Sequence, residues 1–340
     1  MSYKRFDQED IVVSAESITT PLWSEDSTIL TGFFTSSTQI GGTSADYYYD
    51  VYQTGSGLSN SRVQFSIAYA DKQGSGSLLF NDNVPGKSPS STIYGQYRNL
   101  VLGDEEAEFT FGGKNSEHFY VLAIDRARYK EKILPGTFTL KLGISGSNRI
   151  VSLTDNSLVS ATTTFTDSGR VYELVSGSVG SVNTSVEANG YTNGSGSYGK
   201  LLPDVGIILL NGTALDSPNS LGGIELSTNR SSNSGGNNIR RMYDYIKYPA
   251  HFRLQSEETI SSNFVFVRAR NAEFNYSTNP SLITGSGELR HSVMINSPQS
   301  FATSVGLYND NNDLLAVAKL SRPLLKDFTK ESLIRVKLDY

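Results

Sequence analysis

Apolar residues occur along this chain in short runs separated by Gly, Ser, Thr and Asn, and this spacing favours a strand-rich fold. The clearest run is Arg62–Tyr69, where the two alternating sets are Val63, Phe65, Ile67, Tyr69 and Gln64, Ser66, Ala68. Alternation with period 2 is typical of a β-strand. The 31 Gly, 19 Tyr and 16 Phe residues also favour strands and turns over long helices.

Other segments follow the same reasoning. Strands are predicted at Phe119–Ile124, Thr137–Leu142, Arg149–Leu153, Arg170–Val175, Val205–Leu210, Phe252–Leu254, Asn263–Arg270, Ser304–Tyr308, Leu314–Leu320 and Leu333–Leu338. A helix is predicted from Ser90 or Ser91 to Gly103, another over Ile239–Tyr248 before Pro249, and one or two helical turns within Arg126–Ile133. The predicted fold class is mainly β with minor α (α+β).

The organisation predicted along the chain is two strand-rich domains with long polar loops and an extended N-terminal arm. Residues 1–40 form the arm, residues 41–145 a strand-rich α+β domain, and residues 239–340 a C-terminal β-rich domain. Residues 146–238 are rich in Gly, Ser and Asn and are interpreted as an insertion. Between residues 145 and 200 a β-hairpin and a flexible surface loop are both compatible with the sequence, whereas residues 189–199 are predicted to be a loop.

Charge and cysteine content restrict the classes of function. The 29 basic and 34 acidic residues are spread along the chain without blocks, so the sequence predicts no nucleic-acid partner. The absence of cysteine excludes disulfides and thiolate metal sites. No run approaches the ~20 apolar residues of a membrane span, and the start of the chain lacks a signal-peptide core. We expect cytosolic synthesis without Sec export.

Candidate metal ligands are sparse. The three histidines, His118, His251 and His291, are far apart in the sequence, and structural or surface roles fit them better than a metal site. The run Asn309–Asp313 offers oxygen ligands for Ca²⁺ but lacks the central Gly and terminal Glu of an EF-hand loop. A polar turn joining two hairpin strands is the better interpretation. No cofactor is predicted.

Candidate catalytic groups also favour a structural interpretation. Asp104, Glu105, Glu106 and Glu108 could supply the carboxylate pair of a glycoside hydrolase, but a solvated turn fits such a cluster better. The Gly-Ser-Gly tripeptides lie in polar turn sequence and none belongs to a GxSxG element. The sequence therefore predicts a protein without catalytic residues, and not an enzyme.

Two clusters are candidate interaction sites. Tyrosines supply large, rigid contact areas and are enriched at interfaces, and basic-aromatic helices can dock on partners. The candidate interface residues are Tyr47, Tyr48, Tyr49, Tyr52, Arg240, Arg241, Tyr243 and Tyr245. A core strand with one exposed face explains the tyrosines almost as well, and a plain amphipathic surface helix explains the second cluster equally well.

Five segments resemble structural tail or baseplate proteins of T4-like phages of marine cyanobacteria. They are TIYGQYRNLVLG (Thr92–Gly103), FYVLAIDRARYKEKILPG (Phe119–Gly136), PDVGIILLNGTALD (Pro203–Asp216), VRARNAEFNYSTNPS (Val267–Ser281) and VGLYNDNNDLLAVAKLSRPL (Val305–Leu324). The resemblance implies assembly contacts and no catalytic residues.

The resemblance and the missing chemistry lead to one expected function and two alternatives. We expect a non-enzymatic subunit of a phage virion, in the contractile-tail baseplate as a wedge-type component, with other virion structural proteins and copies of itself as partners. A receptor- or carbohydrate-binding module of a tail fibre or neck appendage, with host-surface contact through Tyr47–Tyr49, is the first alternative. A tail-associated lysin that uses Glu105 and Glu106 is the second.

Overall fold

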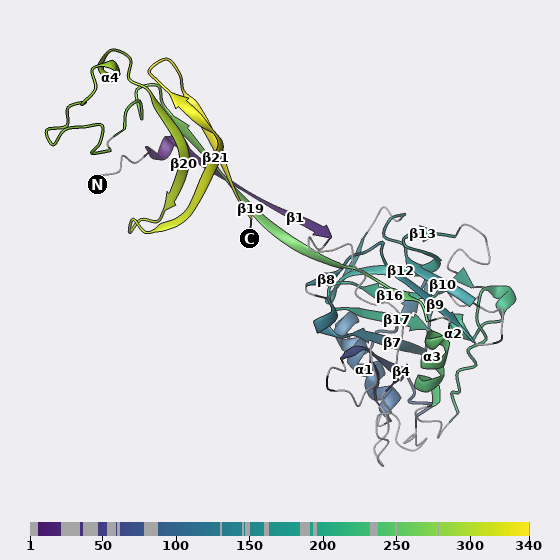
Figure 1. Ribbon diagram of the computed structural model, residues 1–340. Coiled ribbons are helices and arrows are strands. Elements are labelled where there is room, and N and C mark those ends of the chain that lie inside the picture. Colours follow the sequence, from purple (N-terminus) through teal and green to yellow (C-terminus); the bar gives the residue numbers. More distant parts are fainter. Residues whose placement is uncertain are drawn as a thin grey trace. The chain divides into compact units, whose positions relative to one another are not determined.

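In the computed structural model the chain forms two compact units (Figure 1). Unit 1 comprises residues 1–19 and 259–340, and unit 2 comprises residues 20–258. The structure describes residues 6–21, 35–36, 47–52, 59, 62–77, 88–129, 131–144, 146, 150–159, 163–183, 191–192, 196–231, 237–248, 250–277 and 279–339. Strands make up 46% of the described residues and helices 16%, which confirms the predicted mainly β fold class.

Unit 2 is built on one large antiparallel sheet. Its strands follow the order β18 (Phe252–Arg253), β9 (Thr139–Gly143), β10 (Ile150–Asp155), β12 (Gly169–Ser178), β16 (Gly199–Leu202), β17 (Ile207–Asn211), β7 (His118–Ile124), β4 (Val63–Asp71), β3 (Tyr49–Tyr52) and β2 (Thr35–Ser36). The short strands β11 (Thr164–Thr166) and β13 (Ser181–Val182) pair with β12. Most strands that follow one another along the chain are also neighbours in the sheet, and two long-range pairings, β7 with β17 and β9 with β18, join these sequential groups.

The remaining elements of unit 2 are short. Helices α1 (Pro89–Leu102), α2 (Gly212–Asp216) and α3 (Asn237–Lys247) accompany the 3-10 turns η2 (Arg126–Arg128) and η4 (Asn219–Leu221). Two small hairpins are β5 (Thr110–Phe111) with β6 (Lys114–Asn115) and β14 (Tyr191–Thr192) with β15 (Gly196–Ser197). Strand β8 (Lys132–Ile133) pairs with the first residues of β19 (Ser256–Ala269).

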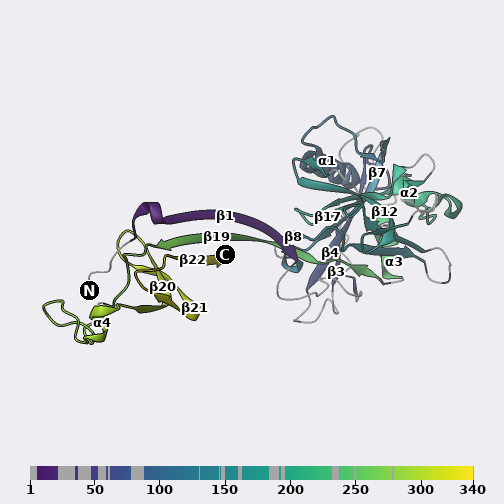
Figure 2. The ribbon, with the colours of Figure 1, turned by 90° about the horizontal axis from the view of Figure 1, so that it is seen from above.

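Helices cover both faces of the central strands. Phe65 and Ile67 of β4 belong to a buried cluster that includes Met242 of α3, whereas Ala68 belongs to a second cluster with Ile93 of α1. Alternate side chains of a strand point to opposite faces, so α1 and α3 pack on opposite faces of the sheet. Figure 2 shows the two helices flanking β4, β7 and β17. The predicted strand at Arg62–Tyr69 is confirmed, and both of its faces are buried.

A proline and a glycine mark the two ends of helix α1. The helix begins at Pro89, one residue before the predicted start, since proline fits the first helical turn, where its missing N–H has no intrahelical partner. The preceding Ser88 side chain donates a hydrogen bond to the Gly74 carbonyl, at 3.0 Å, and does not cap the helix. Gly103 ends the helix as predicted, with a φ of 64° that favours glycine.

The boundaries of the two units differ from the predicted domain limits. The expected insertion at residues 146–238 contributes β10, β12, β16 and β17 to the middle of the main sheet. Residues 239–258 belong to unit 2, and residues 1–19 of the expected arm belong to unit 1. Asn-Gly is typical of tight turns, but at Asn211–Gly212 it begins helix α2. Parts of residues 1–40 and 189–199, and Pro249, lie outside the described residues.

A charged network ties the start of β19 to the main sheet within unit 2. The Arg170 guanidinium donates to Asp204 Oδ1 from Nη2, at 2.8 Å, and also to Glu257, whose side chain is 3% exposed. Burial lowers the pKa of Arg170, but the hydrogen bonds to Asp204 and Glu257 outweigh it and hold the pKa above its usual value. Lys132 lies 3.9 Å from Asp204 at the exposed edge of this network.

Unit 1 contains two small sheets. Strand β19 lies between β1 (Ile11–Pro21) and β22 (Ser332–Asp339) and pairs with β22 in antiparallel register, with Ala269 opposite Ser332. Strands β20 (Ser300–Tyr308) and β21 (Leu314–Lys326) form the predicted hairpin as a separate two-stranded sheet (Figure 1). A 3-10 turn η1 (Gln8–Asp10) and the short helix α4 (Val293–Asn296) complete the described elements.

An ion cluster joins η1 to the end of β19 within unit 1. The buried carboxylate of Asp10 accepts hydrogen bonds from Arg268 Nε, at 2.9 Å to Oδ1, and pairs with Arg270 Nε, at 2.8 Å to Oδ2. Burial raises the pKa of Asp10, but the hydrogen bonds from Arg270 and Arg268 outweigh it and leave the pKa below its usual value. The cluster therefore fixes η1 beside the end of β19.

We expect Arg170→Met to lower the free energy of unfolding of the full chain by ~3–5 kcal/mol, because it leaves Glu257 buried without its cation. Lys132→Met is the matched control, since its exposed, longer-range pair should cost less than ~1 kcal/mol. Urea denaturation followed by circular dichroism measures both. Equal stabilities for the two variants would contradict a structural role for this network.

We expect acid to release η1 from β19. A carboxyl with a lowered folded pKa stabilises the folded state above its unfolded pKa of ~3.9, and this stabilisation is lost as the pH falls through the folded value. Hydrogen exchange, corrected for intrinsic rates, should show protection at Arg268–Arg270 above about pH 5 and its loss below about pH 4. Asp10→Asn should lose this protection at both pH values, whereas Glu9→Gln, at an exposed carboxylate, should keep the wild-type profile.

Candidate functional site

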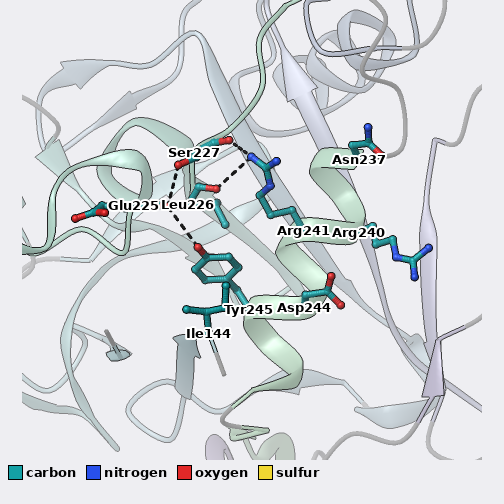
Figure 3. Close-up of a pocket in the computed structure, with 9 residues that line it drawn as sticks. All are labelled: Ile144, Glu225, Leu226, Ser227, Asn237, Arg240, Arg241, Asp244 and Tyr245. Atoms are coloured by element: carbon teal, nitrogen blue, oxygen red, sulfur yellow. Dashed lines mark hydrogen bonds between the residues drawn. The ribbon is translucent and has the colours of Figure 1, made fainter. Parts of the chain in front are cut away.

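A pocket of about 430 Å³ lies beside α3 in unit 2. Helix α3 buries Ile239, Met242 and Ile246 against the sheet, and the same 3.6-residue period leaves Arg240 and Asp244 exposed. The lining residues are Ile144, Glu225, Leu226, Ser227, Asn237, Arg240, Arg241, Asp244 and Tyr245 (Figure 3). Residues from one helix and one irregular segment therefore form most of this α3 pocket.

Backbone carbonyls form one wall of the α3 pocket. Glu225 and Ser227 have φ values of 50° and 56°, so this segment follows a path that few non-glycine residues adopt. Arg241 donates hydrogen bonds to the Ser227 carbonyl and, at 3.4 Å, to the Leu226 carbonyl, while the Tyr245 hydroxyl donates to the Glu225 carbonyl at 3.3 Å. Figure 3 shows both side chains pointing toward this wall and Arg240 pointing away from it. Arg241 and Tyr245 therefore hold the wall in place.

The candidate interface residues separate into buried and accessible ones. Tyr49, Tyr243 and Tyr245 are buried in the core of unit 2, where the rings of Tyr49 and Tyr243 pack with centroids 5.3 Å apart. Among the others, Tyr47 and Arg240 are exposed, and Tyr48, Tyr52 and Arg241 are half-buried. The structure thus brings the two predicted clusters together through Tyr49 and Tyr243, and it uses this contact for packing within the chain.

Tyr48 has an intramolecular role of its own. Its hydroxyl donates to Gln96 Oε1 at 3.1 Å and lies 3.2 Å from the Tyr97 hydroxyl, both on α1. These contacts anchor the start of β3 to the helix. Of the tyrosine cluster, only Tyr47 presents a large exposed ring.

The histidines have separate surroundings. His118 is buried, and its Nε2 lies 3.1 Å from Asp216 Oδ2, which joins β7 to α2. Burial and the charges of Lys141 and Arg253 lower the pKa of His251. Across the described part of the chain, no cluster of three or more His, Cys, Asp or Glu residues is arranged to hold a metal ion.

The predicted polar turns are found where the sequence placed them. The side chains of Asp104, Glu105, Glu106 and Glu108 are exposed, and Glu108 pairs with Lys72. In Asn309–Asp313, Asn309 Oδ1 accepts from the Asp313 backbone N–H at 2.7 Å, and its Nδ2 donates to Asp313 Oδ2 at 3.0 Å. These oxygens are used to close the hairpin loop.

The surface that sequence reasoning missed lies in unit 1. Of the hydrophobic residues described there, only Val267, Ala269 and Val336 are buried. The exposed apolar residues of the β20–β21 hairpin, here named the hairpin surface, are Phe301, Tyr308, Leu314, Leu315 and Val317. A signal for this surface was present in the sequence. A strand with one buried face carries apolar residues at alternate positions only, whereas Ser300–Tyr308 and Leu314–Leu320 carry them at both odd and even positions.

An apolar groove of about 460 Å³ adjoins the hairpin surface within unit 1. Its walls include Val267 and Ile334 from one sheet of the unit, Phe301 and Leu324 from the other, and Phe6 and Phe274 from segments outside the strands. At one end, the buried Lys326 ammonium donates to Asn275 Oδ1 at 2.8 Å and to the carbonyls of Asn271 and Asp327 at 3.0 Å. Burial lowers the pKa of Lys326.

These features define a mainly β protein with a well-packed unit and a poorly packed one. Comparison with models of known protein families, with curated proteins and with solved structures gives no match. None of the helices in the described part of the chain has the length and apolar character needed to cross a membrane. The resemblance to phage tail proteins stays a prediction.

We expect Arg241→Met to destabilise the full chain by ~1–3 kcal/mol, because the carbonyls of Leu226 and Ser227 lose their donor. Arg240→Met removes the same charge from an exposed neighbouring position and should change stability by less than ~0.5 kcal/mol. Thermal unfolding of both variants provides the comparison. A larger loss for Arg240→Met than for Arg241→Met would rule out this account of the pocket wall.

Proposed function

We propose that this chain is a non-enzymatic structural subunit of a phage virion, a wedge-type component of the contractile-tail baseplate that acts through obligate subunit interfaces. The observation that carries the proposal is the scarcity of buried apolar side chains in unit 1. A domain of about 100 residues ordinarily needs a contiguous hydrophobic core to offset its loss of conformational entropy. Among the described residues, the two large buried clusters consist of unit 2 side chains alone.

Assembly would supply the burial that unit 1 lacks. Its exposed apolar side chains lie on β1, on β22, on the hairpin surface and at Tyr276, Ile295 and Phe328, so they would be shared among several contacts. Obligate interfaces resemble a domain core divided between two chains, and their apolar side chains are exposed in the isolated subunit. The resemblance of five segments to tail and baseplate proteins supports the virion as the setting for these contacts.

Purified particles of the encoding phage test this proposal directly. Quantitative mass spectrometry should detect the chain in a fixed ratio to other tail proteins, and labelled copies should locate it at the baseplate in electron micrographs. A major tail protein and a phage enzyme made only in the infected cell are the positive and negative controls. Absence of the chain from particles that contain the positive control would overturn the proposal.

A further inference from the structure

Strand β20 has an open edge without charged residues or proline, and its pairing with β21 shifts register between Ala302 and Ser304 and between Leu307 and Tyr308. It extends over nine residues, Ser300–Tyr308, and β21 is its only partner strand among the described residues. Its sequence, SFATSVGLY, contains neither a charged residue nor a proline. Natural edge strands usually carry such residues because they discourage pairing with another chain.

The other outer strands of unit 1 do carry these residues. Strand β21 contains Lys319, Arg322 and Pro323, and β22 contains Arg335 and Lys337. Strand β1 contains Glu16 and ends at Pro21. Pairing any of them with its own copy would bring like charges close together or introduce a proline that cannot donate. Only β20 can pair with itself without these costs.

We propose that β20 pairs in antiparallel register with β20 of a second copy of this chain across a two-fold axis. The product is a four-stranded sheet in the order β21, β20, β20 of the partner, β21 of the partner. This inference rests on the proposed function, because it names the partner in one of the obligate interfaces. A hairpin alone is marginally stable in water, whereas a sheet of three or more strands with an apolar face can be stable.

Charge balance and the exposed side chains of β20 favour a second copy as the occupant. Residues 1–19 and 259–340 contain eleven acidic and eleven basic residues, so two copies of unit 1 meet without net repulsion. The five side chains of the hairpin surface are 47–68% exposed. The pairing would cover the backbone edge of β20 and bring its Phe301 and Tyr308 close to the partner strand, whereas Leu314, Leu315 and Val317 lie on β21, away from the axis.

The two-fold axis restricts the register. Residues opposite each other in an antiparallel sheet have side chains on the same face. Two copies of one strand satisfy this only when one residue lies opposite the same residue of the partner, and the axis passes between these two residues. With the axis at Ser304, the centre of the strand, Phe301 lies opposite the partner's Leu307. Paired Cα atoms in an antiparallel sheet are ~4.5–5.5 Å apart, which is within the range of a disulfide.

Single cysteines test the pairing in the full chain, which has none of its own. Under mild oxidation we expect Ser304→Cys to form a covalent dimer at least about tenfold faster than Ser321→Cys, an exposed serine on β21. Thr303→Cys and Val305→Cys test axes displaced by one residue. If none of the three β20 variants exceeds the Ser321→Cys rate, the pairing is wrong.

Charge substitutions give an independent measurement. Ser304→Lys places two like charges opposite each other and should weaken self-association by about tenfold or more in sedimentation equilibrium, whereas Ser321→Lys should not. Equal effects of the two changes would overturn the pairing. The outcome is separable from the proposed function: a chain found in virions without β20 cross-linking refutes only the pairing, and a cross-linked chain absent from virions refutes only the virion role.

Discussion

Burial of apolar side chains on both faces of one sheet is the constraint on which unit 2 depends. Strands β4, β7 and β17 are neighbours, and almost all of their side chains are buried or half-buried because α1 and α3 cover opposite faces. Since the strands in contact are far apart in sequence, the core forms only when distant segments meet. The ion pairs of Arg170 and the hydrogen bonds of Arg241 then fix irregular segments at the edges of that core.

Unit 1 also contains many apolar residues, but few of them are buried. Its strands are long, yet only three described hydrophobic side chains are buried, so backbone pairing and the Asp10 ion cluster account for more of its internal contacts. Polar contacts of this kind fix geometry but add little net stability, because water competes for the same groups. The uneven burial between the units is the physical reason for assigning the chain a role in assembly.

Local pattern predicted the elements, and long-range contacts decided their arrangement. The strands at Phe119–Ile124 and Val205–Leu210, the two main helices and the hairpin around Asn309–Asp313 follow from periodicity and turn residues, and the structure confirms them. The domain limits could not follow, because no local signal shows that β10, β12, β16 and β17 lie between β9 and β7, two strands of the predicted domain at residues 41–145. The burial of the candidate interface residues could not be predicted for the same reason. Tyr49 and Tyr243 are 194 positions apart, and each is buried partly by the other.

The charged and proline-containing stretch of β21 has a consequence for how large an assembly can grow. When β20 pairs with its own copy, β21 becomes the outermost strand on each side, and Lys319, Arg322 and Pro323 face any further addition. Sheet growth therefore ends at two chains. A particle of defined size needs such terminating contacts, because an interface that repeats without closing produces fibres.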